Sequence, residues 1–231
     1  MSPRDVRERR GVVIAIDGPA ASGKSSTAQW VARELSIRHV DSGSLYRAAT
    51  WAALLDAPDP GAWTPESVLA ASSGIRLLPT SVSFVPFLDD VDLTEATRSA
   101  TVTSQVSSVA RMGEVRAWVN DCVRAVAKDH DVVVDGRDIG TAVFPDAGLK
   151  IFLVADPWER ARRRLVQRLG RSPTEAEIAA ETEWLVRRDA ADATQTVQAR
   201  DAILLDTTYL TQQEQVERIV ALARAAFSEL S

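Results

Sequence analysis

Cysteine is nearly absent from this sequence, in which Cys122 is the single one among 231 residues. One cysteine excludes an intramolecular disulfide and a zinc site built from cysteines, and such usage fits a reducing cytoplasm. We expect Cys122 to serve as a small apolar residue on a helix.

Long apolar runs and a basic excess are also missing. No stretch approaches the ~20 apolar residues that a membrane span needs. Residues 1–10 are polar and lack an apolar core, so we expect no signal peptide and a frayed tail there. The 27 basic and 32 acidic side chains give a net charge of −5, which supplies no general attraction for nucleic acid or anionic membranes. An anionic ligand would therefore need a local cluster of arginines.

Short β-branched runs alternate with helical periodicity along the chain, a pattern typical of a parallel sheet covered by helices on both faces. Apolar residues at helical spacing follow the first run at Ala28, Val31 and Leu35. Thr211 and Glu214 predict a capping box at the start of the last helix. The predicted strands are Val12–Ile16, Arg38–Asp41, Val132–Asp135, Lys150–Val154 and Ala202–Asp206.

The segment of residues 58–100 breaks this alternation. Val82 and Phe84 alternate with polar neighbours, and Asp89-Asp90 is typical of a turn. We expect a small β-containing insert here, which grips one substrate and moves, on an α/β core formed by residues 11–57 and 101–231.

A phosphate-binding loop follows the first predicted strand. The residues from Gly18 to Ser25 match G-x-x-x-x-G-K-[ST] in full, between a strand and a helix, where the motif needs to lie. Glycine lets backbone N–H groups turn inward, and the helix adds the positive end of its dipole. Lys24 can reach the β- and γ-phosphates of ATP, while the Ser25 hydroxyl can ligate Mg²⁺. The residues expected to bind ATP in this loop are Gly18, Pro19, Ala20, Ala21, Ser22, Gly23, Lys24, Ser25 and Ser26.

The loop by itself fits a kinase, a GTPase, a motor ATPase or a nucleotide-binding regulator. No guanine-reading Asn-Lys-x-Asp sequence is present, and the chain is short for a motor with extra domains. These two observations favour a small kinase.

Arginines and carboxylates stand at the ends of two other predicted strands. One strand end gives Asp41 and Arg47, and the other gives Asp135, Arg137 and Asp138. The carboxyl ends of parallel strands form the ligand crevice of such a sheet, so both groups should face the phosphate-binding loop. Arginine suits phosphate because its planar fork donates two parallel hydrogen bonds. The alternatives are a solvated helix residue for Arg47 and an ion pair with a neighbouring aspartate for Arg137.

The chain resembles a known family, the bacterial cytidylate kinases, over about residues 11 to 225. The resemblance rests on motifs in the family's order and approximate spacing: "AIDGPAASGKSS", "DSGSLYR", "SSVARMGEVR", "VVDGRDIGTAVFPDAGLKIFL", "ERARRR", "RRDAAD" and "AILLDTT". It implies a P-loop nucleoside monophosphate kinase fold with five parallel strands, a lid at about residues 160–195 and a monophosphate-binding insert. It also favours a monomer, and it implies transfer from ATP to CMP or dCMP with Mg²⁺.

The resemblance also carries over residue roles at matching positions. For the acceptor nucleotide they are Asp41, Ser42, Arg47, Ser107, Arg116, Arg137, Asp138, Arg188 and Asp192. Of these, Arg47 and Arg137 match arginines on the acceptor phosphate, and Arg188 with Asp192 matches a pair near the ribose. The cytosine-reading positions match Ser107, Arg116 and Asp138. On the donor side, the arginines of a lid helix are Arg160, Arg163 and Arg164, and for at least one of them a solvated helix face is the better interpretation.

Several positions depart from the family pattern. Gln195 stands where an arginine usually binds the acceptor phosphate, the following stretch is about four residues short, and Gly113 replaces a common proline. Ser104 competes with Ser107 for the base-reading position. The only histidines, His39 and His130, match nothing and are expected to be structural or exposed. The alternative function is a same-fold nucleotide-binding protein with weak or redirected activity, for example a UMP kinase.

Overall fold

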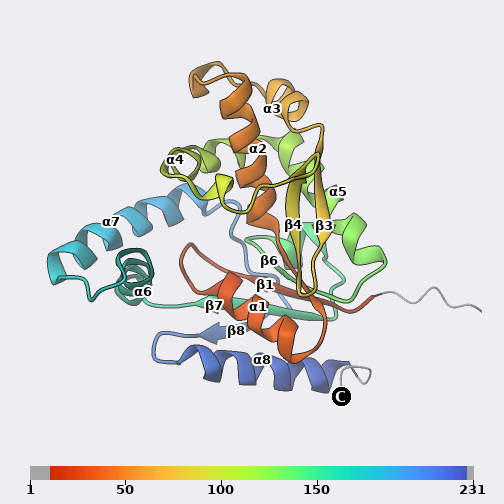
Figure 1. The fold of residues 1–231 in the computed structure, drawn as a ribbon. Helices are drawn as coiled ribbons and strands as arrows, with labels where there is room; N and C mark the ends of the chain where they lie inside the picture. Colours follow the sequence, from red (N-terminus) through yellow and green to blue (C-terminus); the bar gives the residue numbers. More distant parts are fainter. Residues whose placement is uncertain (1–10, 228–231) are drawn as a thin grey trace, which may run out of the picture.

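A mostly parallel sheet, with antiparallel pairing of β3 and β5 to β4, forms the centre of the structure (Figure 1). The computed structural model describes residues 11–227, so the tail expected over residues 1–10 lies outside the described part. The eight-stranded sheet has the order β3-β4-β2-β6-β1-β7-β8, with β5 paired to β4. The five predicted strands are adjacent and parallel within it: β1 (Val13–Asp17), β2 (Arg38–Asp41), β6 (Val132–Asp135), β7 (Leu149–Val154) and β8 (Ile203–Asp206). The α/β fold class predicted from the sequence is therefore confirmed.

Helices cover both faces of this sheet because side chains alternate along each buried strand. In β1, Ile14 and Ile16 pack toward α1 (Lys24–Glu34) and α8 (Gln212–Ala226), which lie together on one face in Figure 1. Ala15 faces the opposite layer, formed by α2 (Ser42–Asp56) and α5 (Gly113–Lys128). Thr211 and Glu214 form the predicted capping box of α8. Cys122 lies half-buried on α5 and is free.

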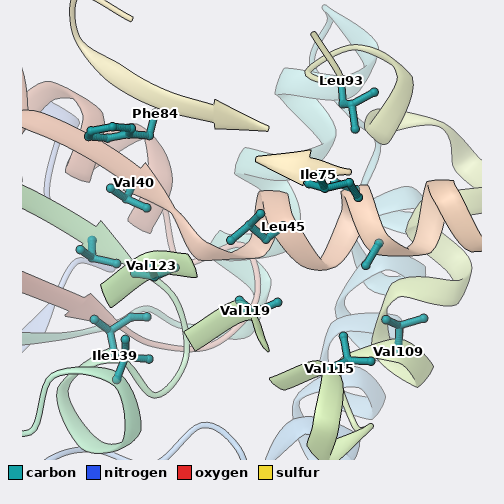
Figure 2. Packing of buried hydrophobic residues seen from close by; sticks show 14 of the residues in the cluster. Val40, Leu45, Ile75, Phe84, Leu93, Val109, Val115, Val119, Val123 and Ile139 are labelled. Carbon is teal, nitrogen blue, oxygen red and sulfur yellow. The ribbon is translucent and has the colours of Figure 1, made fainter. Parts of the chain in front are cut away.

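Residues 58–100 extend the central sheet. Their elements are η1 (Pro60–Ala62), α3 (Pro65–Ala71), β3 (Ile75–Pro79), β4 (Ser83–Leu88), β5 (Val91–Asp92) and η2 (Ala96–Arg98), followed by α4 (Ala100–Val109). β4 pairs in parallel with β2, and Asp89, at φ 52°, turns the chain into β5. Figure 2 shows Ile75 and Leu93 from this segment in the same apolar cluster as Leu45 of α2. The segment therefore shares the core of the parallel sheet.

Two helices stand beside the carboxyl edge of the sheet: α6 (Pro157–Leu169) and α7 (Glu175–Asp192). They pack against each other through Ala161 and Leu165 of α6 and Ile178 and Leu185 of α7, and this cluster includes Ala20 of the phosphate-binding loop. The helix pair covers the segment predicted as a lid, and it reaches the loop directly. Among the described residues no helix is long and apolar enough to cross a membrane.

Candidate active site

The loop between β1 and α1 has a backbone that only glycine adopts easily at two positions. Gly18 has φ 149°, and a Cβ there would lie 2.2 Å from the Leu153 carbonyl oxygen of the neighbouring strand. Gly23, at φ 89°, is the N-cap of α1. In the first turn of α1, the Thr27 hydroxyl donates to Oε1 of Gln215 on α8 at 3.0 Å. The loop is thus held against β7 at one end and by a buried bond at the other.

Lys24 and Ser25 present their polar groups at the end of this loop. The Lys24 ammonium donates to the Pro19 carbonyl oxygen at 2.6 Å, across the loop. Desolvation and the charge of Arg137 lower the Lys24 pKa to about 8. The nearby aspartates act in the opposite direction, but they do not outweigh these two effects. The Ser25 hydroxyl donates to Oδ2 of Asp135 at 2.6 Å. The sequence motif and the end of β6 therefore meet at one point.

The strand-end arginines each contact a carboxylate. The Arg47 guanidinium lies 2.5 Å from Oδ2 of Asp41. Burial acts to raise the Asp41 pKa, but Arg47 and the His39 charge outweigh it and hold that pKa below its ordinary value. Arg137 pairs at 2.9 Å with Oδ2 of Asp192, not with a neighbouring aspartate.

Arg188 joins the same group from α7. Its Nε lies 3.7 Å from Oδ2 of Asp192. Burial lowers the Arg188 pKa, and nearby positive charges lower it further, those of Arg137, Arg164 and Arg47. Within residues 11–227, Nη1 of Arg137 and Nε of Arg188 are buried without a hydrogen-bond acceptor. Three guanidiniums whose charges act on a fourth, with spare buried donors on two of the four, form an environment that favours an anion with several oxygens.

A second cluster lies where α5 meets the segment after β6. Arg116 pairs with Oδ2 of Asp138, and its Nη1 donates to the Ala110 carbonyl oxygen at 3.1 Å. The guanidinium carbon lies 5.9 Å from the ring centroid of Tyr46, whose pKa is raised to about 12, mainly by burial. The Arg116 Nη1 also donates to Oε1 of Gln195 at 3.4 Å. These four contacts hold the Arg116 guanidinium in place.

The three arginines of α6 expected on the donor side, Arg160, Arg163 and Arg164, have separate partners. Arg160 is buried; its Nη1 donates to the Ala20 carbonyl oxygen at 2.8 Å and pairs with Asp189 of α7 at 2.7 Å. Arg163 donates to the carbonyl oxygens of Thr207 and Thr208, after β8, at 2.7 and 2.9 Å. None of the three lies on a solvated helix face.

Arg164 pairs with Glu181 of α7 at 2.8 Å and lies over the ring of Trp184. Its partner Glu181 also pairs with Arg168 at 3.2 Å, so the two helices are joined by ion pairs as well as by apolar contacts.

Comparison with known proteins shows the family of this chain. The family described as "Cytidylate kinase" matches residues 14–225. This chain belongs to the cytidylate kinase family. Among curated family members, the cytidylate kinase of Streptomyces griseus subsp. griseus is 39% identical over 222 residues, covering 93% of each chain. That of Alkaliphilus oremlandii is 40% identical over 217 residues, covering 92% of this chain and 98% of that one. A solved shikimate kinase from Bacteroides thetaiotaomicron has a TM-score of 0.46 at 15% identity, covering 92% and 98% of the two chains.

Two side chains of this cytidylate kinase family member contact the site but were not among the residues predicted to bind substrate. Asp135, 2% exposed, bridges Ser25 and His39, whose Nε2 lies 2.6 Å from its Oδ1. His39 is buried, in line with the structural role expected for it; His130 stacks edge-on against Phe84. Desolvation opposes the charged form of His39, but the hydrogen bond to Asp135 raises its pKa. Asp135 ends the apolar run "VVVD" and was expected from that position to face the phosphate-binding loop, although no substrate role was assigned to it.

Asp17, at the end of β1, is the site residue that the sequence predictions missed. Its carboxylate accepts from the backbone N–H groups of Ile139 and Gly140 at 2.8 and 2.7 Å, in the π-helical segment η3 (Ile139–Val143). Burial raises its pKa to about 6, more than the two hydrogen bonds lower it. Asp17 therefore fixes the segment that carries Asp138 to the strand next to the loop.

Ser104 and Ser107, the two alternatives for the base-reading position, lie on α4. Ser104 is exposed and its hydroxyl donates to the Thr101 carbonyl oxygen at 2.8 Å, whereas Ser107 is half-buried. Ser42, at the start of α2, is buried and donates to the Asp135 carbonyl oxygen at 2.8 Å. The roles of these residues in binding remain predictions.

Proposed function

We propose that this protein transfers the γ-phosphoryl group of ATP to CMP or dCMP, giving ADP and CDP or dCDP. Membership of the cytidylate kinase family supports the reaction, and one observation in the structure carries the proposal. The charge of Arg137 acts on Lys24 of the phosphate-binding loop, and the charges of Arg137, Arg164 and Arg47 all act on Arg188, so these four arginines form one cluster beside the loop. Proteins catalyse phosphoryl transfer mainly by aligning the reacting groups and stabilising the charge that develops on them. A cluster of arginines supplies that charge stabilisation.

On the donor side, we propose that the loop N–H groups and Lys24 hold the β- and γ-phosphates of ATP. The dipole of α1 favours their negative charge. Arg163, which is held by the carbonyl oxygens of Thr207 and Thr208, is proposed for the donor phosphates. Arg160 differs from the role implied for it, because its guanidinium is buried against the Ala20 carbonyl oxygen. We infer that Arg160 shapes the loop rather than touching phosphate.

The residues around Ser25 fit a magnesium ion bound with ATP. A hydroxyl and a carboxylate oxygen 2.6 Å apart, at the end of a phosphate-binding loop, are the hard oxygen donors that Mg²⁺ prefers. We propose that Ser25 and Asp135 hold the ion together with the phosphates. The ion would neutralise charge that builds up on the transferring group.

On the acceptor side, we propose that Arg47, Arg137 and Arg188 bind the monophosphate while Arg116 and Asp138 read the cytosine. An oxygen of the acceptor phosphate attacks the γ-phosphorus, the bond from that phosphorus to the bridging oxygen breaks, and ADP leaves. No nucleophilic side chain is needed. The spare buried donors on Arg137 and Arg188 would bind phosphate oxygens. We further propose that residues 58–100 and the α6–α7 pair close over the nucleotides and exclude water.

The test is a coupled assay of ADP release with CMP, dCMP, UMP, AMP and GMP as acceptors. We expect turnover with CMP and dCMP, and a loss of several orders of magnitude in kcat for Lys24→Ala with an unchanged circular-dichroism spectrum. Release with UMP in place of the cytidine nucleotides would favour a redirected kinase. Nucleotide binding without release would favour a binding protein of the same fold.

A further inference from the structure

Trp184 on α7 contacts two of the clustered arginines at once. The guanidinium carbon of Arg164, on α6, lies 4.7 Å from the centroid of the Trp184 ring, and the guanidinium carbon of Arg188 lies 5.2 Å from the same centroid. Both distances are within the ~6 Å at which a cation is attracted to an aromatic face. A single side chain therefore joins an arginine expected on the donor phosphates to one expected on the acceptor.

The geometry of a stacked arginine matters for what it can still bind. A guanidinium over a ring uses its flat face, so the N–H groups in its plane stay available to oxygen acceptors. An ion pair, by contrast, uses those N–H groups. Arg188 fits the first case, because its nearest carboxylate atom in the described chain is 3.7 Å from Nε and that Nε has no hydrogen-bond acceptor among residues 11–227.

Trp184 contributes little to the packing of the helix pair. Its side chain is 40% exposed and is not part of the apolar cluster formed by Ala161, Leu165, Ile178 and Leu185. A large indole left half in solvent between two arginines buries less apolar surface than it would inside that cluster. Its contacts with the two cations therefore lie outside that cluster.

We propose that Trp184 is a positioning residue that holds Arg164 and Arg188 side by side before either nucleotide binds, with Arg164 also held by Glu181 and the Nε–H of Arg188 left free. The proposal rests on the function proposed above. Two like charges brought close together repel, and in solvent both long side chains would sample many rotamers. The ring offsets the repulsion and restricts those rotamers. The two side chains therefore lose less conformational entropy when phosphate binds.

The experiment compares Trp184→Leu, Trp184→Phe and a matched control, Trp158→Leu. Trp158 lies on α6 and is 39% exposed, and it has no cation–π contact among the described residues. We measure the Kd of ATP and of CMP separately by isothermal titration calorimetry, kcat and KM by ADP release, and the melting temperature. We expect Trp184→Leu to weaken each nucleotide about two- to fivefold, the loss of one cation–π contact per arginine, with a melting temperature close to the parent. Trp184→Phe retains a ring and should recover at least half of each loss on a logarithmic scale; Trp158→Leu should bind as the parent does.

A fluorescence readout separates positioning from general structure. Nucleotide binding that engages Arg164 and Arg188 changes the surroundings of the Trp184 indole, so the emission change on titration should be lost in Trp184→Phe and kept in Trp158→Phe. Unchanged Kd values in Trp184→Leu, or equal losses in Trp184→Leu and Trp184→Phe, would overturn the proposal. So would an equal loss in Trp158→Leu. Failure of the proposed function would appear instead in the parent protein, as absent turnover with CMP and dCMP.

Discussion

Gly18→Ala tests whether the phosphate-binding loop must approach β7 as closely as the structure shows. A Cβ at this position would lie 2.2 Å from the Leu153 carbonyl oxygen, 1.2 Å short of the 3.4 Å at which ordinary contact begins. The obstacle is backbone in a buried strand, so the loop has to move. Displacement of binding groups by about 1 Å is worth about 10²-fold in rate, and the backbone at φ 149° adds ~1–3 kcal/mol of strain for alanine. We therefore expect kcat/KM for ATP to fall about 100-fold and the free energy of unfolding to fall by ~1–3 kcal/mol.

The matched control is Gly113→Ala, at the first residue of α5. A Cβ there meets nothing within 4 Å, and the position has no positive φ. This change should leave kcat/KM unaltered and raise the free energy of unfolding by about 0.4–1 kcal/mol, because alanine restricts the unfolded chain. ADP release and urea denaturation measure both quantities. If Gly18→Ala keeps kcat/KM within threefold of the parent, the argument from close approach is wrong.

Three further predictions concern charge. The raised pKa of Asp17, about 6 against 3.8 when unfolded, means that the folded protein holds a proton that the unfolded chain releases as pH rises from about 4 to 6. The free energy of unfolding should fall by up to about 3 kcal/mol over that range relative to Asp17→Asn, which urea denaturation at several pH values checks. Lys24, with its pKa lowered to about 8, loses its proton above that pH, so the Kd of ATP should rise about tenfold from pH 7 to 9 in the parent and stay flat in Lys24→Arg. Gln195→Arg should lower the KM of CMP about tenfold, since a new charge-assisted contact is worth roughly 1.5–3 kcal/mol and Arg116 is already neutralised by Asp138; an unchanged KM would contradict this.

The parts of the site that lie close together in the chain were predictable from the sequence. The loop motif is contiguous, and β2 and β6 begin and end where the apolar runs do. β1 extends one residue further than predicted, to Asp17, because two backbone N–H groups from η3 satisfy that buried carboxylate inside the sheet. The pairing of Arg137 with Asp192 joins residues 55 apart and depends on how α7 docks, which no local pattern encodes.

Three neighbouring strands end in aspartate, and their parallel register brings the carboxylates together. Asp41 aligns with Asp135, and Asp135 aligns with Ile16, which precedes Asp17. Three bare carboxylates at one sheet edge would repel one another and the phosphates as well. Each therefore has its own partner: Arg47 for Asp41, Ser25 and His39 for Asp135, and backbone N–H groups for Asp17. The strand-end pattern in the sequence implies that the three meet, but the division of partners follows from which helix begins beside each strand. Asp17 is the one of the three without a cation in contact, and its pKa is raised to about 6. The charge of this sheet edge therefore changes near pH 6, at the end of the strand that leads into the phosphate-binding loop.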